Sequence, residues 1–278
     1  MLTTLIYIDT NVYLDFYQAA HDSIAVFDEL HEVRENLVIT EQTGQEFARN
    51  RNSRLAQLAG NIMKSNSMNP YTVSVVRETP EYKEWLAAKK VAESAVKKLA
   101  ARIETWILDE DQDPVTKGIK KLIGEMNYYV TNAEVIEKAK LRKILGNPPT
   151  SPDKYTIGDE LIWETLLEQC DKDLIIVSRD KTFLENYGML RAEYDSKIRK
   201  LVGVTDSLSN ALKIIGKPAV AIAKAEKEVK AGANDEITTG ICSVCGTEME
   251  ESGYEGSEGD SAWWLDCPKC GHTAFPSK

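Results

Sequence analysis

The chain alternates between short apolar runs and longer segments with helical periodicity. Five of the runs are rich in Ile, Val and Leu and lack a polar alternation, which is typical of strands that are buried on both faces of a parallel sheet. Helical patterns lie between most of these runs. The order predicts an α/β domain with layered helices around a parallel sheet. The predicted strands are Leu5–Ile8, Leu37–Ile39, Tyr71–Val76, Leu174–Val177 and Leu201–Val204.

Residues 81–146 have a different character from the rest of the sheet domain. They are highly charged, and in their first half apolar residues recur three to four positions apart, as on one face of a helix. The pattern breaks at Asp113-Pro114 and then continues to Gly146. We therefore expect an α-helical hairpin that is inserted between strands of the sheet.

The composition changes twice more towards the carboxyl end. Residues 1–215 contain the predicted sheet and its helical insertion. Residues 216–236 are rich in Ala, Lys and Glu, which predicts a linker with a short helix. Residues 237–278 contain four of the five cysteines and are expected to form a small separate domain.

The overall charge limits the kinds of partner that the chain can bind. The 278 residues include 34 Lys and Arg against 44 Asp and Glu, a net charge of −10. This acidic total argues against a general electrostatic grip on nucleic acid, but carboxylates clustered around a metal ion would also count towards it. No apolar run approaches the roughly 18 residues of a membrane span. The amino-terminal MLTTLIYIDTNVYLDF lacks the features of a secretory signal, so a cytoplasmic location is expected.

Two aspartates come directly after predicted strands. Asp9 follows the first strand, and Asp180 follows the strand that ends at Val177. Open α/β sheets bind ligands at the carboxyl ends of their strands. Each residue also has an ordinary alternative explanation, since Asp9 could cap the next helix and Asp180 could belong to a turn.

A third aspartate lies at the start of a predicted helix. Asp159 precedes the apolar Ile162 and Trp163 by three and four residues, which places it on the inward face of that helix. A carboxylate there needs a metal ion or a basic partner, although a first-turn aspartate is also favoured by the helix dipole. Its neighbour Glu160 is aligned with Glu164 and is expected to face solvent.

Glu46 completes a set of four acids. It lies on the helix after the second strand, where Glu41 in the first turn is a competing candidate. Four carboxylates near the strand ends of one sheet favour Mg²⁺ or Mn²⁺, which bind oxygen ligands. The three histidines are distant in sequence from these acids, so a histidine-based mechanism has little support.

Several segments together resemble a known family. The DTN after the first strand, QEFARN, IGDELIW and VSRDKTF are similar to the PIN-domain ribonucleases, in particular to a larger bacterial class with a helical insertion. The resemblance covers about residues 1–215. It implies a metal-dependent nuclease, most simply an endoribonuclease, that hydrolyses phosphodiesters with Mg²⁺ or Mn²⁺. The implied catalytic, metal-binding acids are Asp9, Glu46, Asp159 and Asp180, with Thr10, Asn11 and Ser178 as polar support.

Three arginines follow Glu46 on the same predicted helix. Arg49, Arg51 and Arg54 would form a basic stripe beside the acids, which is a plausible track for a nucleic-acid backbone. A solvated helix face is the alternative interpretation.

The carboxyl-terminal cysteines form two CxxC pairs. Two thiolates spaced in this way can hold one ion, and two pairs complete a tetrahedral shell, which predicts a structural Zn²⁺ site that resembles the zinc ribbons. Metal binding would then supply the folding energy of this small domain. Its acidic loop favours a protein contact over a phosphate contact. The predicted ligands are Cys242, Cys245, Cys267 and Cys270.

Other functions stay open at this stage. A non-catalytic module could bind RNA or a protein and dock through the ribbon. A phosphatase of the haloacid-dehalogenase type also uses an aspartate after its first strand, but its second acid would be at position 11, which is Asn11 here. A toxin role with an antitoxin-like inhibitor and, by analogy, a homodimer are further expectations.

Overall fold

The computed structural model describes residues 4–18, 23–64, 74–151, 154–195, 199–234, 250–255, 262–266 and 273–274. The chain divides into two compact units. The first unit contains Met1–Ala56 and Thr105–Glu226, and the second contains Gln57–Glu104 and Lys227–Lys278. Within the described ranges, the helices are too short or too polar to cross a membrane.

The first unit is built on a parallel sheet of five strands in the order β3-β2-β1-β4-β5. All four neighbouring pairs are parallel, with Ile6 opposite Leu37 and Ile175 in register with Ile6 on the other side. The predicted α/β class with a parallel sheet is therefore confirmed. The strands are β1 (Leu5–Ile8), β2 (Leu37–Thr40), β3 (Asn127–Tyr129), β4 (Leu174–Val177) and β5 (Leu201–Thr205).

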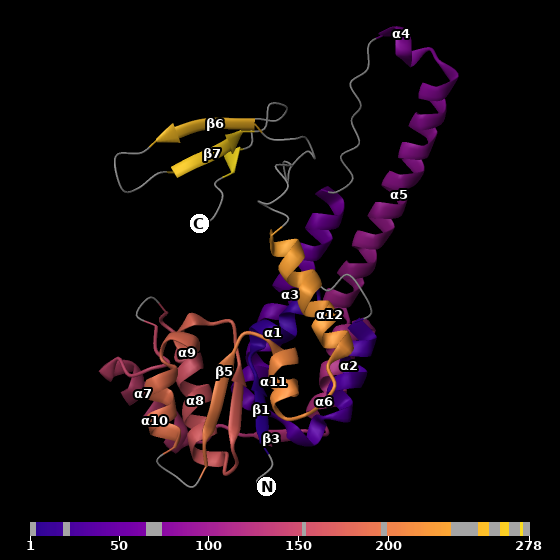
Figure 1. The fold of residues 1–278 in the computed structure, drawn as a ribbon. Coiled ribbons are helices and arrows are strands. Elements are labelled where there is room, and N and C mark those ends of the chain that lie inside the picture. Colours follow the sequence, from indigo (N-terminus) through magenta and orange to yellow (C-terminus); the bar gives the residue numbers. More distant parts are fainter. Residues whose placement is uncertain are drawn as a thin grey trace. The chain divides into compact units, whose positions relative to one another are not determined.

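Helices cover both faces of this sheet (Figure 1). On one side lie α7 to α10, and on the other lie α2, α6 and α11. The 3₁₀ turns are η1 (Arg34–Asn36) and η2 (Glu110–Gln112). The helices of this unit are α1 (Thr10–Asp15), α2 (Ser23–Glu32), the first part of α3 (Glu41–Lys64), α6 (Pro114–Ile123), α7 (Ala133–Leu145), α8 (Gly158–Gln169), α9 (Lys181–Glu185), α10 (Tyr187–Tyr194), α11 (Leu208–Ile214) and the first part of α12 (Val220–Asn234).

The three central strands, β1, β2 and β4, are buried at every position and almost wholly apolar. Successive side chains of a strand point to opposite faces. Leu5 and Tyr7 of β1 therefore join a core with Trp163 of α8 and Tyr194 of α10. The alternate residues of the same strands are equally buried and belong to the other side of the sheet.

The predicted strand at Tyr71–Val76 is wrong for its described part. Ser74–Arg77 form the short helix α4, and residues 71–73 lie outside the described ranges. The edge position beside β2 is occupied by β3. This strand has only three residues, none of which is fully buried, and the Asn127 side chain donates hydrogen bonds to the backbone carbonyls of Glu35 and Leu37. An edge strand this short and polar leaves no hydrophobic run in the sequence.

The segment 81–146 is consequently more than a helical hairpin. The long helix α5 (Pro80–Leu108) is followed by η2, α6, β3 and α7, so the second half of the segment contributes a strand and two packed helices to the first unit. Gly146 ends α7 in the left-handed conformation, with φ 70°, and its N–H bonds back to the carbonyls of the last turn. That boundary agrees with the sequence pattern.

The segment 216–236 was expected to be a linker with a short helix. It contains the helix α12, and the first part of that helix is tied to the first unit. The Glu29 carboxylate accepts hydrogen bonds from the backbone N–H groups of Val220, Ala221 and Ile222, at 2.8, 2.8 and 3.0 Å, and so caps the start of α12. Glu226 accepts hydrogen bonds from the N-terminal turn of α11. Residues 220–226 therefore belong to the packed structure.

The second unit contains the rest of α3 and α12, most of α5, the helix α4 and a small antiparallel sheet. That sheet has the order β6-β7-β8, with Tyr254 paired with Trp263. Its strands are β6 (Glu250–Glu255), β7 (Ala262–Asp266) and β8 (Thr273–Ala274). The predicted zinc ligands Cys242, Cys245, Cys267 and Cys270 all lie outside the described residues.

Candidate active site

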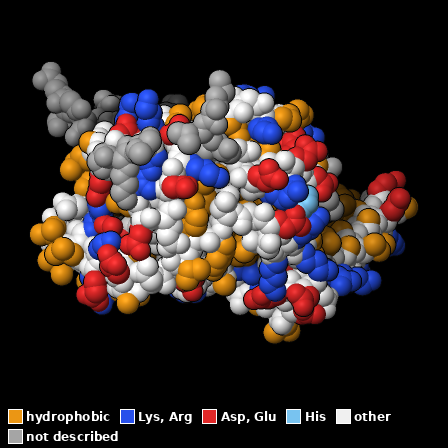
Figure 2. All heavy atoms as spheres, turned by 90° about the horizontal axis from the view of Figure 1, so that it is seen from below, with side chains coloured by type: hydrophobic (Ala, Val, Ile, Leu, Met, Phe, Trp, Pro, Cys, Tyr) orange, Lys and Arg blue, Asp and Glu red, His pale blue; other side chains and the backbone are white. Residues whose placement is uncertain are grey.

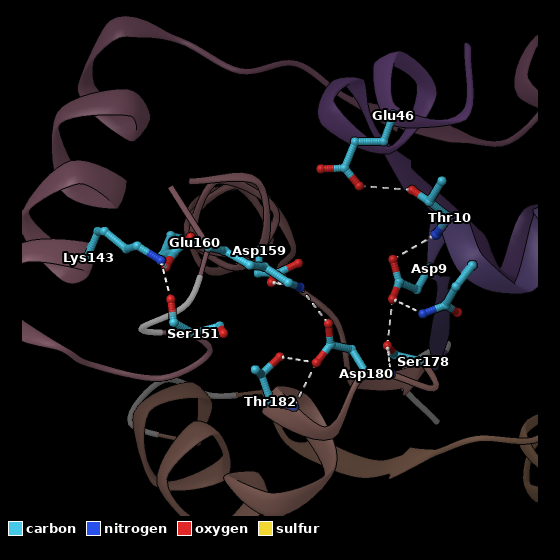
Figure 3. A network of polar contacts seen from close by, with 12 residues as sticks. Asp9, Thr10, Glu46, Lys143, Ser151, Asp159, Glu160, Ser178, Asp180 and Thr182 are labelled. Carbon is cyan, nitrogen blue, oxygen red and sulfur yellow. Dashed lines mark hydrogen bonds and ion pairs between the residues drawn. The ribbon is translucent and has the colours of Figure 1, made fainter. Parts of the chain in front are cut away.

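Four carboxylates come together at the carboxyl edge of the parallel sheet, and each comes from a different element (Figure 3). Asp9 follows β1, Glu46 lies on α3, Asp159 lies in the first turn of α8, and Asp180 follows β4. The parallel pairing of β1 with β4 carries Asp9 and Asp180 to the same edge of the sheet. The structure therefore brings together the four acids that the sequence singled out.

Asp9 is the most buried of the four, with an exposed fraction of 6%. Its Oδ1 accepts a hydrogen bond from the backbone N–H of Thr10 at 2.7 Å, so Asp9 also caps α1. Its Oδ2 accepts hydrogen bonds from Asn11 Nδ2 at 2.8 Å and Ser178 Oγ at 2.5 Å. These three donors are neutral. They fix the orientation of the carboxylate without neutralising its charge.

Burial raises the pKa of Asp9 to about 6. The negative charges of Asp159 and Glu46 also raise it, while the hydrogen bonds from Ser178 and Thr10 lower it. Burial likewise raises the pKa of Asp159; the contact with Lys154 lowers it, and the charges of Asp180 and Glu46 raise it further. The four acids thus repel one another in a poorly solvated place, and a bound cation would relieve that repulsion.

Glu46 is positioned by its neighbours on three elements. Its Oε2 accepts a hydrogen bond from Thr10 Oγ1 at 3.2 Å, and its Oε1 accepts one from Gln42 Nε2 at 2.8 Å. Gly158 at the start of α8 leaves the room for it, because a Cβ there would lie 2.2 Å from Glu46 Oε1. The glycine before Asp159 therefore lets the α3 carboxylate approach the amino-terminal end of α8.

Asp180 and Asp159 share a basic partner that the sequence analysis did not identify. Lys154 Nζ lies 2.9 Å from Asp159 Oδ2 and 2.8 Å from Asp180 Oδ2. Asp180 also caps α9 by accepting hydrogen bonds from the N–H and Oγ1 of Thr182. Burial raises the pKa of Asp180, but the contacts with Lys154 and Thr182 lower it more, so this pKa lies below its ordinary value. Lys154 lies in the loop between α7 and α8.

The helix that carries Asp159 differs in one respect from the expectation. Glu160 and Glu164 were expected to face solvent, but both are buried because α7 packs against α8. Glu160 pairs with Lys143 at 3.3 Å, and Glu164 pairs with Arg142 at 2.6 Å (Figure 3 shows the first pair). The amphipathic pattern of one helix cannot indicate that a second, basic helix covers its polar side.

The three arginines of α3 have different environments. The Arg49 side chain is 58% exposed and lies 4.0 Å from Glu46 Oε1. Arg54 is half-buried, and its charge acts on Asp15. Arg51 is only 1% exposed and pairs with Asp113, so its interpretation as a nucleic-acid contact is wrong. Figure 2 shows acidic and basic side chains interspersed on the face seen from below, and not a surface of one sign.

The residues present suit a divalent metal ion by their chemistry. Carboxylate oxygens are the ligands that Mg²⁺ and Mn²⁺ prefer. Within the described part of the chain, however, no three His, Cys, Asp or Glu side chains are arranged closely enough to hold an ion as they stand. At Asp159 and Asp180 the position between the carboxylates is taken by Lys154.

The family of the chain follows from comparison with known proteins. A family model described as the PIN domain matches residues 6–183, so the chain belongs to the PIN domain family. Members of this family are generally metal-dependent nucleases that act on nucleic acids and usually use Mg²⁺ or Mn²⁺. Comparison with curated proteins and with solved structures returned no match.

Proposed function

We propose that this protein is a metal-dependent endoribonuclease that hydrolyses phosphodiester bonds at the cluster of Asp9, Glu46, Asp159 and Asp180. One observation carries the proposal. In a chain of the PIN domain family, four acids from four separate elements converge, and the innermost of them is a buried carboxylate with a raised pKa. Perturbed carboxylates at the carboxyl edge of a parallel sheet are typical of functional sites.

Different residues of the chain would bind the ion, orient the carboxylates and contact the nucleic acid. Asp9, Glu46, Asp159 and Asp180 would hold Mg²⁺ or Mn²⁺, and when bound the ion supplies an activated water and stabilises the leaving oxygen. Asn11, Ser178 and the N–H of Thr10 orient the Asp9 carboxylate, and Thr10 Oγ1 orients Glu46. Arg49, at the exposed end of this cluster, would contact the nucleic-acid backbone.

The alternatives are weaker on the same geometry. In a phosphatase of the haloacid-dehalogenase type, position 11 would provide an acid. Here Asn11 donates a hydrogen bond to Asp9, so it orients the carboxylate, and as an amide it cannot act as a general acid or base. A non-catalytic binding module needs no buried, mutually repelling carboxylates, which cost stability. For the carboxyl-terminal domain, the proposal is that its four cysteines hold a structural Zn²⁺ ion and that the domain contacts a protein.

A cleavage assay with labelled RNA and DNA tests the proposal. Single-stranded RNA, structured RNA and single-stranded DNA are each incubated with Mg²⁺, Mn²⁺ or EDTA. We expect internal cleavage of RNA that requires the metal and disappears in Asp9→Asn/Asp159→Asn. The matched control is Glu134→Gln/Glu137→Gln, which neutralises two exposed acids of α7 and should cleave like the wild type. A folded protein that cleaves none of the substrates would contradict the proposal.

A second prediction concerns Gly158, whose Cβ-free backbone admits the Glu46 carboxylate. In Gly158→Ala the new methyl group must displace the far end of the Glu46 side chain, since it would lie 2.2 Å from Oε1. We expect the free energy of unfolding to change by less than about 1 kcal/mol, because the displaced group is flexible and alanine favours the helix. We expect Mn²⁺ affinity to fall by roughly 10–100-fold, as for loss of a metal site's supporting contacts.

The control for this prediction is Gly188→Ala on α10, where a Cβ would meet no atom within 4 Å. Calorimetric titration with Mn²⁺ and thermal unfolding of both variants separate the two effects. Unchanged Mn²⁺ affinity in a folded Gly158→Ala protein would show that Glu46 does not need its present position to bind the ion.

A further inference from the structure

The Lys154 ammonium lies between two carboxylates of the acid cluster. Lys154 Nζ contacts Asp159 Oδ2 at 2.9 Å and Asp180 Oδ2 at 2.8 Å. The two carboxylates belong to different elements, the first turn of α8 and the loop after β4. A single positive charge therefore bridges two of the four acids and joins the two elements.

The four acids differ in whether they contact a positively charged group. Asp9 accepts hydrogen bonds from the neutral Ser178, Asn11 and Thr10 N–H, and Glu46 accepts them from the neutral Thr10 and Gln42. Direct contact with an ammonium is made by Asp159 and Asp180. The lysine thus neutralises the half of the cluster that lies on α8 and the β4 loop.

We propose that Lys154 is a built-in counter-ion that competes with the divalent ion for Asp159 and Asp180. The proposal rests on the proposed function, since it assumes that these two carboxylates bind the ion. Mg²⁺ binds oxygen ligands at about 2.0–2.1 Å, and a divalent ion repels a neighbouring ammonium. A divalent ion that binds Asp159 Oδ2 and Asp180 Oδ2 would therefore displace Lys154 from them.

The side chain is suited to such a displacement. Lys154 is 45% exposed, whereas Asp159 and Asp180 are 16% and 24% exposed, so the lysine reaches the acids from the solvent side. A lysine has a flexible four-carbon stem and a strongly hydrated head, and it can swing into water at low cost. Lys154 would hold the acids together in the metal-free protein and lower the affinity for the ion.

The test is a calorimetric titration with Mn²⁺ of the wild type, Lys154→Met and Lys154→Arg. The matched control is Lys140→Met, which removes a lysine of α7 that is 52% exposed and pairs with Glu137. We expect Lys154→Met to lower the Mn²⁺ dissociation constant about tenfold, equivalent to 1.4 kcal/mol. Lys154→Arg and Lys140→Met should bind like the wild type. Any binding by the carboxyl-terminal cysteines is common to all four proteins and cancels.

Thermal unfolding with and without Mn²⁺ is a second test of the role of Lys154. Without Mn²⁺, Lys154→Met should melt at a lower temperature than the wild type, and Mn²⁺ should remove the difference. If Lys154→Met is poorly folded, Lys154→Gln replaces it. Equal or weaker Mn²⁺ binding by a folded neutral variant would overturn the role of Lys154 and leave the proposed function standing. Absence of Mn²⁺ binding in every protein, the wild type included, would overturn both.

Discussion

Asp9→Asn is expected to stabilise the metal-free protein at pH 7.5 and to abolish metal-dependent cleavage. The carboxylate is 6% exposed, its partners are neutral donors, and the charges of Asp159 and Glu46 act on it. Asparagine has the same shape and no charge. Its oxygen can still accept from the N–H of Thr10, and Ser178 Oγ can rotate to accept from its amide. The substitution therefore removes repulsion and keeps the contacts with Thr10 and Ser178, while the Asn11 amide loses its acceptor.

The size of the gain follows from the pKa of Asp9. It rises from 3.8 to about 6, and each unit corresponds to about 1.36 kcal/mol, so we expect a gain of about 1–3 kcal/mol in the free energy of unfolding. Loss of the carboxylate should reduce cleavage by more than the roughly 10–100-fold that loss of an outer-shell partner costs. Urea unfolding in metal-free buffer and the RNA cleavage assay measure the two effects.

The pH dependence gives this prediction a sign that can be checked. Because folding raises the pKa of Asp9, the stability linked to its protonation is fully present below about pH 4 and is lost as the pH rises through about 6. In metal-free buffer, the advantage of Asp9→Asn should therefore shrink as the pH is lowered from 7.5 to 5. Mn²⁺ affinity of the wild type should fall over the same interval. An advantage that grows towards pH 5 would contradict the assignment.

Arg51→Met is expected to have the largest effect on stability, a loss of about 3–5 kcal/mol in the free energy of unfolding. Arg51 Nε lies 2.9 Å from Asp113 Oδ2 and 2.8 Å from Thr116 Oγ1, and its guanidinium also donates to the carbonyl of Trp106. Arg51 and Asp113 are 1% and 0% exposed. Methionine fills part of the space but leaves Asp113 as a buried charge without its cation, and breaking a buried pair in this way is costly.

The matched control is Arg49→Met, two residues earlier on the same helix, whose side chain is 58% exposed. It should change stability by no more than about 0.5 kcal/mol, as exposed substitutions usually do. Adding Asp113→Asn to Arg51→Met should recover part of the loss, because it removes the stranded charge and keeps a cap for α6. Chemical unfolding of the four proteins completes the comparison. A loss below 1 kcal/mol in Arg51→Met would show that Asp113 finds another partner.

The acid cluster could be predicted because each acid stands beside a strong local pattern. Asp9 and Asp180 directly follow continuous apolar strands, and all parallel strands end at one edge of the sheet. Asp159 precedes Ile162 and Trp163 by three and four residues, which is the spacing of one face of a helix. In each case the position relative to the strand or helix is a local property, so it can be recognised without knowledge of the contacts.

The partners of these acids could not be predicted in the same way. Lys154 lies in a loop, where no period relates a residue to a surface. Arg51 is four residues from both Phe47 and Leu55, on the buried stripe of α3, whereas Arg49 is exposed. The partner of Arg51, Asp113, is recognisable only because the start of α6 lies against it. The strand Asn127–Tyr129 is recognisable only beside β2, because its edge position requires little hydrophobicity. These features depend on which elements become neighbours.

The sequence by itself therefore determined the parallel α/β architecture and the four acids at the carboxyl edge of the sheet. The pattern of apolar residues along the chain predicts both the buried strands and the buried faces of the helices. The tertiary structure decided which charges meet: Lys154 with Asp159 and Asp180, Arg51 with Asp113, and Glu46 with the bare backbone of Gly158. The reason is physical, since charge pairing depends on distances of a few ångströms between residues that are far apart in sequence.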